Sequence, residues 1–350
     1  MNEEKKIKRI FKKRKILGQN YEKLLDIIED NLDFFLNLTY DIKVKNFGHV
    51  IKVYIPDTKF PAISITGTAC ALNCEHCNAK YLKGMKPITN KLELEDFLVS
   101  HFENGGVGAL ISGGCDLNGK VPLNDFIESI KKVKSRTDLI INVHTGLLNA
   151  ETSKALSKAG VDIISFDVNA DNNIIKEIYH LNKNVDDYKR SIQSLKKNGL
   201  KIVPHVCIGL YYGKLHHELK SLKFIKKILP NPDLIVLIAL IPPKDPLNKF
   251  KTPNPKDIGK VIGITRILFP KTEISLGCMR PRGSIKIEIE KLAFKAGITR
   301  IEIPSKETLR WMREIDPIIK FEYYSACCAI PKSYEKQARS NIREIKGFLV

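Results

Sequence analysis

The amino-acid sequence predicts an α/β fold, a (β/α)8 barrel of the TIM type that is complete or nearly so. From residue 60 onward, short apolar segments rich in β-branched residues alternate with longer amphipathic segments. Such alternation is typical of parallel βαβ units. About eight units fall within residues 60–305, and about 250 residues is the usual size of such a barrel. A doubly wound open sheet is the alternative, and the number of units favours the barrel.

Each expected strand is a short apolar run that a helical pattern follows. In chain order, the expected strands are residues 62–68, 107–114, 139–146, 161–169, 201–210, 234–243, 273–279 and 298–305. Two of the expected helices, KALSKAG and SLKKNG, end in glycine directly before the next strand, as helices commonly do. We expect residues 1–59 to form a helical extension that leads into the strand-like HVIKVYIP. Residues 60–305 would form the barrel, and residues 306–350 a helical and irregular C-terminal tail.

Composition narrows the possible functions. The chain has 350 residues, of which 43% are hydrophobic, and a formal net charge of +19. No segment approaches the roughly 18 consecutive apolar residues of a membrane span, and the charged N-terminus lacks the apolar region of a secretory signal. We therefore expect a cytoplasmic protein without a membrane partner. The lysines are spread over many helices, which fits the alternative that the charge only reflects a lysine-rich proteome. Among charged partners, an acidic protein or anionic substrate is favoured over nucleic acid.

Three of the eight cysteines follow the first expected strand within eight positions, in the sequence TACALNCEHC. Cys70, Cys74 and Cys77 have the spacing C-x3-C-x2-C. A cytosolic compartment disfavours a disulfide framework. Structural zinc usually needs two separated pairs of ligands, which are lacking here unless His76 or a distant residue joins. Three closely spaced thiolates suit three irons of a [4Fe–4S] cluster, with the fourth iron open to a small molecule.

With these residues the chain resembles the radical S-adenosylmethionine (SAM) superfamily, over about residues 60–305. The residue before the last cysteine is commonly aromatic in that family, and here it is His76, whose ring can pack against the cluster and adenine. The resemblance implies that Cys70, Cys74 and Cys77 hold a [4Fe–4S] cluster and that SAM binds its open iron. It implies cleavage of SAM to a 5′-deoxyadenosyl radical, which abstracts hydrogen from an unactivated carbon. A reductant such as ferredoxin or flavodoxin would supply the electron.

The resemblance also assigns SAM contacts after the second expected strand, in SGGCDLNG. Gly113 and Gly114 match a glycine pair that approaches the methionine amino group, and glycine permits a close backbone approach. The acidic residue that usually follows is replaced by Cys115, and Asp116 is displaced by one position. A simple strand-to-helix turn is the alternative interpretation.

Two further segments resemble SAM-binding positions. Asp167 follows the fourth expected strand, where a polar side chain holds the ribose hydroxyls, and Asn169 could share this role. A helix N-cap is the alternative, since Asp and Asn begin helices well. Gly209 and Gly213, in CIGLYYG, resemble a stretch that packs against adenine.

The remaining cysteines point to a second iron–sulfur cluster. Biotin synthase places auxiliary ligands at comparable strand ends, with an arginine from the seventh strand. A barrel would bring the ends of its strands to one mouth. The candidate ligands are Cys115, His144, Cys207, Cys278, Arg280, Cys327 and Cys328. His144 stands where a cysteine is expected, and buried apolar thiols are the alternative for the adjacent pair Cys327 and Cys328.

Such a cluster would donate sulfur, which places the chain near the biotin and lipoyl synthases. We favour lipoyl over biotin synthesis, of the archaeal two-protein type with a paralogous partner subunit. A basic surface would suit an acidic lipoyl carrier domain. Radical SAM modification of RNA or of another cofactor precursor is the alternative that the positive charge favours. A noncatalytic iron–sulfur electron carrier is less consistent with the glycines, because a carrier needs no SAM pocket.

Overall fold

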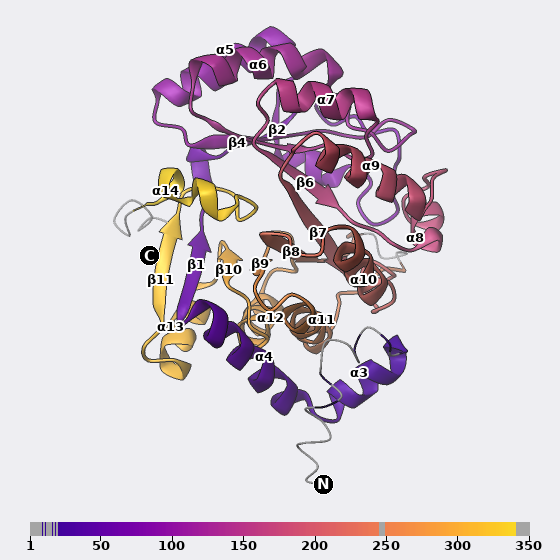
Figure 1. Cartoon of the computed structure of the whole chain (residues 1–350), viewed down its shortest axis with the longest axis vertical. Coiled ribbons are helices and arrows are strands. Elements are labelled where there is room, and N and C mark those ends of the chain that lie inside the picture. Colours follow the sequence, from indigo (N-terminus) through magenta and orange to yellow (C-terminus); the bar gives the residue numbers. More distant parts are fainter. Residues whose placement is uncertain are drawn as a thin grey trace.

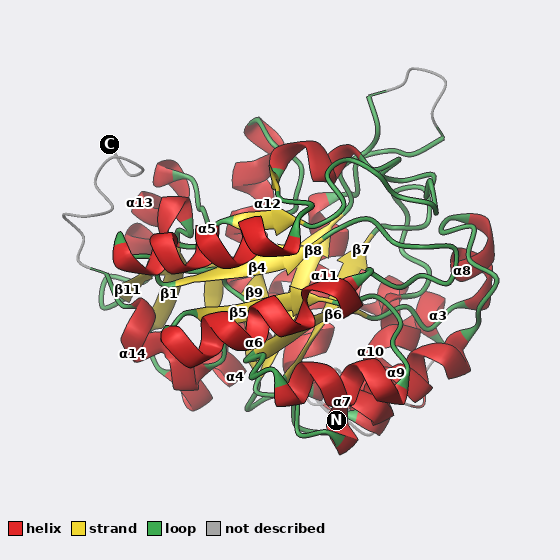
Figure 2. Ribbon diagram, turned by 90° about the horizontal axis from the view of Figure 1, so that it is seen from above, coloured by secondary structure: helices red, strands yellow, loops and turns green. Residues whose placement is uncertain are grey.

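The computed structural model describes residues 20–244 and 249–340, together with Arg9, Phe11, Ile16 and Gly18. An eleven-stranded parallel β-sheet forms its centre, and helices surround the sheet (Figure 1, Figure 2). In chain order, the strands are β1 (Val50–Tyr54), β2 (Ala62–Ser64), β3 (Lys86–Pro87), β4 (Gly108–Ser112), β5 (Ile140–His144), β6 (Ile163–Asp167), β7 (Ile202–Ile208), β8 (Leu234–Ala239), β9 (Glu273–Leu276), β10 (Arg300–Glu302) and β11 (Lys320–Tyr324).

The helices mostly begin and end where local sequence signals predict. The α-helices are α3 (Tyr21–Glu29), α4 (Leu32–Phe47), α5 (Lys91–Glu103), α6 (Ile127–Arg136), α7 (Ala150–Lys158), α8 (Asn172–Glu177), α9 (Val185–Lys197), α10 (Glu218–Ile228), α11 (Pro255–Leu268), α12 (Ser284–Lys295), α13 (Lys306–Ile315) and α14 (Glu335–Ala338). Asn149 and Asn184 cap the starts of α7 and α9 with their side chains. Gly160 and Gly199, directly after the same helices, adopt positive φ angles of 80° and 73°. Among the described residues, no helix combines the length and apolar character that crossing a membrane requires.

The prediction of a parallel α/β barrel fold is confirmed, in the form of a half-barrel. The eight expected strands are β2 and β4 to β10, and they lie in that order in the sheet. The sheet does not close on itself in the described part of the chain. β10 pairs with β1 and not with β2, and the whole order is β11-β1-β10-β9-β8-β7-β6-β5-β4-β2-β3.

Segments on both sides of residues 60–305 add strands to this sheet. β1, from the expected extension, pairs with β10, and β11, from the expected tail, pairs with β1. The sequence analysis expected the strand-like segment before residue 60 but expected no strand in the tail. The sequence KFEYY of β11 alternates polar and aromatic residues at its start, which is the period of a half-buried strand. The division at residues 59 and 305 stays a prediction, and residues 1–8 and 341–350 of its outer parts lie outside the described chain.

The C-terminal tail fills the interior of the half-barrel below the strand ends. Side chains of the sheet alternate between two faces, so Ile141 packs with the helical layer whereas Ile140 points to the opposite face. On that face the small side chains of the tail are buried against the inward-facing strand residues. This inner cluster comprises Tyr54, Phe60, Ile140, Ile163, Val203, Leu234, Val236, Tyr324, Ala326, Cys328, Ala329, Ile330 and Ala338.

A buried network of charged groups fixes the tail in this position. Glu335, at the start of α14, lies 2.7 Å from the ammonium of Lys52 on β1 and 2.7 Å from the guanidinium of Arg300 on β10. It also accepts a hydrogen bond from Tyr54, at 2.8 Å. Glu273, at the start of β9, pairs with the same two cations. Each charge is compensated, and removing one partner would leave an unpaired buried charge, which is strongly destabilising.

Candidate functional site

The cysteine motif lies on the loop after β2, at the carboxyl end of the sheet. Hydrogen bonds fasten this loop to the segment after β4. The backbone N–H of Ala71 donates to the carbonyl of Cys115 at 2.8 Å, and the backbone N–H of Cys115 points at Sγ of Cys70 at 3.4 Å. The N–H of Gly114 donates to Oγ1 of Thr66 at 2.7 Å. Cys70 is therefore held against the end of the neighbouring strand.

Gly114 is required by this close approach. A β-carbon at Gly114 would lie 2.0 Å from the carbonyl oxygen of Ala69 and 2.6 Å from Cα of Cys70. At Gly113 a β-carbon would meet only side-chain atoms, at 3.1 Å or more. The glycine pair thus has a packing role in placing the motif loop, and its contact with SAM stays a prediction. Asp116 is exposed, and its Oδ1 accepts backbone N–H bonds within its own turn.

Cys74, His76 and Cys77 have ligand atoms that all lie within 4.8 Å of one another. The hydrogen bond between the two thiols lowers the pKa of Cys77 and raises the pKa of Cys74. Burial also raises the pKa of Cys74. The thiolate is the form of cysteine that binds metal, so one of the two thiols is already biased toward that form. Cys70 is not in this compact group and instead borders Cys115.

His76 is a buried, neutral ring beside the motif thiols. Burial lowers the pKa of His76 to about 4. Its ring centroid lies 5.4 Å from that of Tyr179, at an interplanar angle of 49°. Nδ1 of His76 is buried and, within the described residues, has no hydrogen-bond partner. Such an orphaned polar atom is uncommon in folded proteins. The assignment of His76 as a neighbour of the cluster and not a ligand stays a prediction.

Asp167 ends β6 and faces the cysteines of the neighbouring strand ends. Its carboxylate is exposed, and no hydrogen bond or ion pair joins it to another described residue. Burial is the main cause that raises the pKa of Cys207, and the negative charge of Asp167 is the second cause. The same charge also raises the pKa of Cys115. An unpaired carboxylate at this position is free to accept hydrogen bonds from a ligand, as a contact with ribose hydroxyls would require.

Asn169 adds an unsatisfied donor two residues further on. Its Oδ1 accepts from the backbone N–H of Asp171 at 3.2 Å, whereas its Nδ2 is buried without a partner in the described part of the chain. The helix-cap alternative for Asp167 and Asn169 is wrong, because the N-cap of α8 is Asp171. That both side chains hold the ribose stays a prediction.

Gly209 and Gly213 shape the loop after β7. Both adopt positive φ angles, 76° and 88°. A β-carbon would lie 2.4 Å from the side chain of Pro253 at Gly209 and 2.2 Å from the carbonyl oxygen of Lys251 at Gly213. These glycines therefore allow residues 251–253 to cover the loop. Whether the loop packs against adenine stays a prediction.

Glu218 organises the same loop and was missed as a site residue. It begins α10 and is fully buried. Its carboxylate accepts backbone N–H bonds from Gly209 at 2.9 Å and His216 at 2.8 Å, and a hydroxyl bond from Tyr21 at 3.3 Å. An acidic residue in a first helical turn is an ordinary sequence signal. That signal does not reveal which distant amides the carboxylate binds.

Three of the candidate auxiliary ligands lie around Asp167. The charge of Asp167 acts on His144 as well as on Cys115 and Cys207. Burial lowers the pKa of His144. The ring of His144 lies edge-on to that of His205, with centroids 5.6 Å apart. His205, which the sequence analysis did not single out, pairs in register with Asp167.

The other candidate cysteines gather at a different place. Cys327 and Cys328 follow β11, and their thiols lie with the carboxylate of Glu302 in a group whose ligand atoms are within 4.8 Å of one another. Cys278, after β9, belongs to the same neighbourhood. Burial raises the pKa of its thiol, and the charges of Glu302 and Cys327 raise it further.

The cysteines near the ends of β4, β7 and β9 do not make such a group. Among the described residues, the ligand atoms of Cys115, Cys207 and Cys278 do not lie together within 4.8 Å. The guanidinium of Arg280 donates to the carbonyls of Gly277 at 2.6 Å and Glu302 at 2.8 Å. It also pairs with Glu290, at 2.5 Å. Arg280 thus ties the loop after β9 to β10, and its role as a cluster ligand stays a prediction.

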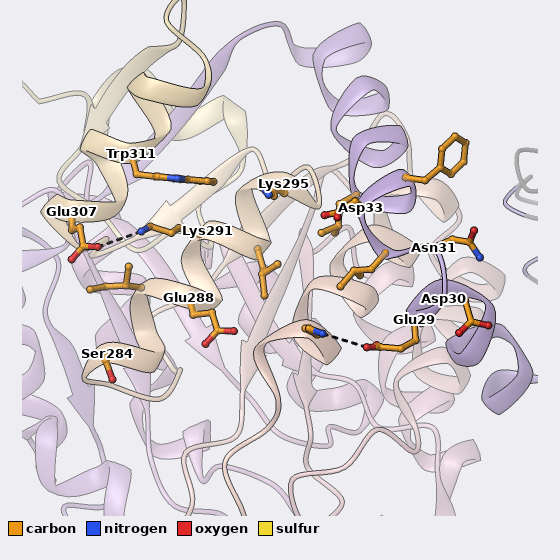
Figure 3. A pocket seen from close by; sticks show the side chains of 16 residues that line it. Glu29, Asp30, Asn31, Asp33, Ser284, Glu288, Lys291, Lys295, Glu307 and Trp311 are labelled. Carbon is orange, nitrogen blue, oxygen red and sulfur yellow. Dashed lines mark hydrogen bonds and ion pairs between the residues drawn. The ribbon is translucent and has the colours of Figure 1, made fainter. Parts of the chain in front are cut away.

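A pocket of about 1030 Å³ lies elsewhere, on the outer helical layer between α3, α4, α12 and α13 (Figure 3). Acidic and basic side chains both line it. Lys291 pairs with Glu307 at 3.3 Å, and Lys256 with Glu29 at 3.5 Å. It contains no cysteine and none of the predicted site residues. We therefore assign the chemistry to the strand ends and not to this pocket.

Comparisons with known proteins agree with this site. The family model described as the radical SAM superfamily matches residues 64–225, which include the motif loop and the loop after β7. Biotin synthase of Buchnera aphidicola subsp. Schizaphis graminum is 25% identical over 246 residues, which are 68% of this chain and 70% of that protein. Biotin synthase of Neorickettsia sennetsu is 26% identical over 282 residues, which are 76% and 82% of the two chains.

Solved structures share the fold. Methylornithine synthase superposes with a TM-score of 0.58 at 17% identity, over 85% of each chain. The [FeFe]-hydrogenase maturase HydG gives a TM-score of 0.62 at 16% identity, over 95% of this chain and 75% of that one. Residues 64–225 of the chain match the radical SAM superfamily, and over about two thirds of its length the chain is similar to biotin synthases.

The residues present fit the cofactors that the superfamily implies, a [4Fe–4S] cluster and SAM. The loop after β2 offers three thiols, a donor set suited to iron–sulfur ligation. Along the same edge of the sheet, the buried nitrogens of His76 and Asn169 lack partners in the described residues. Buried polar groups are normally satisfied, so these orphaned atoms fit a site that binds a polar molecule.

Proposed function

We propose that this radical SAM enzyme inserts sulfur at unactivated carbon, in a reaction of the lipoyl or biotin synthase kind, with lipoyl synthesis favoured. One observation carries the proposal: near the carboxyl ends of the strands there are thiols that the first cluster does not need. They are those of Cys115, after β4, and Cys207, near the end of β7. The similarity to biotin synthases over about two thirds of the chain supports it.

At the first cluster, the chain's own residues would have separate roles. Cys70, Cys74 and Cys77 would bind the [4Fe–4S] cluster, with the position of Cys70 set by Gly114. When bound, the cluster and SAM supply a 5′-deoxyadenosyl radical for abstraction of hydrogen. Asp167 would orient SAM by accepting hydrogen bonds from its ribose.

The sulfur would come from a second iron–sulfur cluster. Cys115, His144 and Cys207 support its position, because they follow or end nearby strands and the charge of Asp167 acts on the pKa of all three. The pKa of His144 is lowered by burial, so its ring is neutral at pH 7, and neutral imidazole is the form that ligates metal. Anaerobic reconstitution should then give about eight irons per chain. A count of about four irons would contradict a sacrificial cluster.

The radical chemistry and the sulfur chemistry need separate experiments. With dithionite as reductant, the reconstituted protein should convert SAM to 5′-deoxyadenosine and methionine. The variant C70A/C74A/C77A should not, and its retention of activity would overturn the cluster assignment. Transfer of sulfide label from the protein to an octanoylated acidic carrier domain would support lipoyl synthesis.

The partners follow from the reaction and the charge. Radical SAM enzymes need an electron donor, for which ferredoxin or flavodoxin are the proposed candidates. The net charge of +19 would suit an acidic lipoyl carrier domain. A paralogous subunit and a cytoplasmic location belong to the same proposal. Strong salt-sensitive binding of tRNA, without sulfur transfer to a carrier, would instead favour the RNA-modifying alternative.

A further inference from the structure

A compact set of metal-ligating side chains lies where the C-terminal tail meets the sheet. Glu302 ends β10, and Cys327 and Cys328 lie three and four residues beyond the end of β11. Glu302 and Cys328 are buried, with exposed fractions of 3% and 2%, and Cys327 is half-buried. Cys278 is near them on the loop after β9, and as a residue it is exposed. None of these groups is needed for the first cluster.

The spacing of these groups fits one metal ion. The thiol sulfurs of Cys327 and Cys328 and a carboxylate oxygen of Glu302 are all within 4.8 Å of one another. Zinc binds thiolates at about 2.3 Å and carboxylates at about 2.0–2.2 Å, so ligands of one ion can be no more than about 4.6 Å apart. The ligands of an iron–sulfur cluster bind separate irons, and adjacent cysteines reach separate irons less readily. The thiol of Cys278 is near this group, since the charges of Glu302 and Cys327 act on it, but it lies outside the three atoms that are within 4.8 Å of one another. The three residues would supply two sulfurs and one oxygen, and the fourth position of a tetrahedral ion would be taken by Cys278 or water.

The backbone that carries these ligands is held in place by two buried arginines. Arg280 donates to the carbonyls of Gly277, next to Cys278, and of Glu302. Arg300 donates to the carbonyl of Cys328 at 3.3 Å and to that of Ile330. The exposed fractions of the two arginines are 2% and 0%. Their charges are paired with carboxylates outside this group, Arg280 with Glu290 and Arg300 with Glu273 and Glu335, so their role here is to hold the backbone.

We propose that Glu302, Cys327 and Cys328, with Cys278 or water in the fourth position, bind a single thiophilic divalent ion, Zn²⁺, separately from any iron–sulfur cluster. The ion joins β10 and the tail, and so fastens the tail in the interior of the half-barrel. Structural zinc sites contribute directly to folding free energy, since the unfolded chain lacks the preformed site. The tail should therefore be more stable with the ion than without it.

The test uses the full-length variant C70A/C74A/C77A, which lacks the first cluster's ligands, so its outcome does not depend on SAM chemistry. Anaerobic titration with Co²⁺ as a probe should show one equivalent per chain, with sulfur-to-cobalt charge-transfer absorption that Zn²⁺ displaces. In this background C327S and E302Q should each weaken the binding at least tenfold. E307Q, which removes a carboxylate outside the group, is the matched control for E302Q and should leave the titration unchanged.

Two results would overturn the proposal. One is a titration with no thiolate-to-cobalt band, or one that C327S and E302Q leave unchanged. The other is the incorporation of about four irons with sulfide at these residues, which would show a cluster in place of a single ion. Elemental analysis of the otherwise unmodified protein gives an independent measurement: one zinc per chain is expected, and C327S should lose it. Folding of each variant is checked by circular dichroism.

Discussion

Gly114 lies directly behind Cys70. A β-carbon added to Gly114 would lie 2.6 Å from both Cα and Cβ of the cysteine. The end of β4 and the motif loop can reach this separation only because one of the two residues has no side chain. The first cluster ligand is therefore positioned by a residue that itself offers no ligand.

Replacing Gly114 by alanine should displace the motif loop. The new methyl group would clash with backbone atoms, which cannot move aside as a flexible side chain can, and overpacking of this kind costs about 1–3 kcal/mol. We expect G114A to lose most of its reconstituted iron and at least tenfold in formation of 5′-deoxyadenosine. G113A is the matched control, because its neighbours are side-chain atoms. Equal iron contents in the two variants would contradict this account.

Asn169 should contribute to SAM affinity. Its Nδ2 is the unsatisfied atom, so N169D removes the donor while an oxygen can still accept from the backbone N–H of Asp171. Loss of one hydrogen bond to a polar ligand corresponds to about tenfold in the dissociation constant. Equilibrium dialysis of SAM with the reconstituted protein should show this loss in N169D. The new carboxylate is buried beside Asp171, so the free energy of unfolding should fall as well, and circular dichroism checks that the variant is folded in the assay. Unaltered SAM affinity would show that Asn169 does not contact the cofactor.

Glu218 should be important for stability as well as for the loop after β7. E218A would leave two backbone N–H groups and a tyrosine hydroxyl without their acceptor, at a cost of about 2–4 kcal/mol. E218Q keeps one oxygen acceptor and should lose less. Glu151 is also an acidic residue in a first helical turn but is exposed, so E151A should change the free energy of unfolding little. Urea unfolding followed by circular dichroism measures the difference, and equal losses in E218A and E151A would contradict it.

His205 should make the protein less stable in mild acid. Burial lowers the pKa of His205 to about 4, from an unfolded value of 6.5. Between these values the unfolded chain binds a proton that the folded chain does not, so the free energy of unfolding falls as the pH falls from 6.5 toward 4. The full effect is about 3 kcal/mol. Anaerobic urea unfolding at pH 7.5 and 5 should show a smaller difference for H205Q than for the unmodified chain, and parallel pH profiles would contradict it.

The sequence predicted the repeating part of the fold because each unit has a local signal. All eight expected strands are present, and glycines such as Gly160 end the expected helices. Closure of the sheet has no such local signal, since it depends on which strand pairs with β10. No local pattern shows that β1, from the first 59 residues, takes that position. β11 lies at the edge of the sheet and begins with exposed and half-buried residues, so it lacks the continuous apolar run of the expected strands.

Some residues of the candidate site could likewise be predicted from the sequence, and others could not. Cys70, Cys74 and Cys77 could be predicted because their ligands share one loop and their spacing is visible in the sequence. The association of Glu302 with Cys327 could not, because the two residues meet only through the pairing of β1 with β10 and β11. His205 and Glu218 carried no signal beyond their residue type, and their partners are set by tertiary contacts.

The pairing of β1 with β11 has a consequence for synthesis of the chain. Val50 pairs with Lys320, so an early strand finds one neighbour only after nearly all of the protein has been made. At about 5–20 residues per second, the ribosome would expose β1 for on the order of ten seconds or more before that neighbour emerges. During this interval the apolar residues of β1 and the inner face of the nascent sheet are uncovered. Assembly of this enzyme in the cell should therefore depend on chaperones that shield the unfinished sheet.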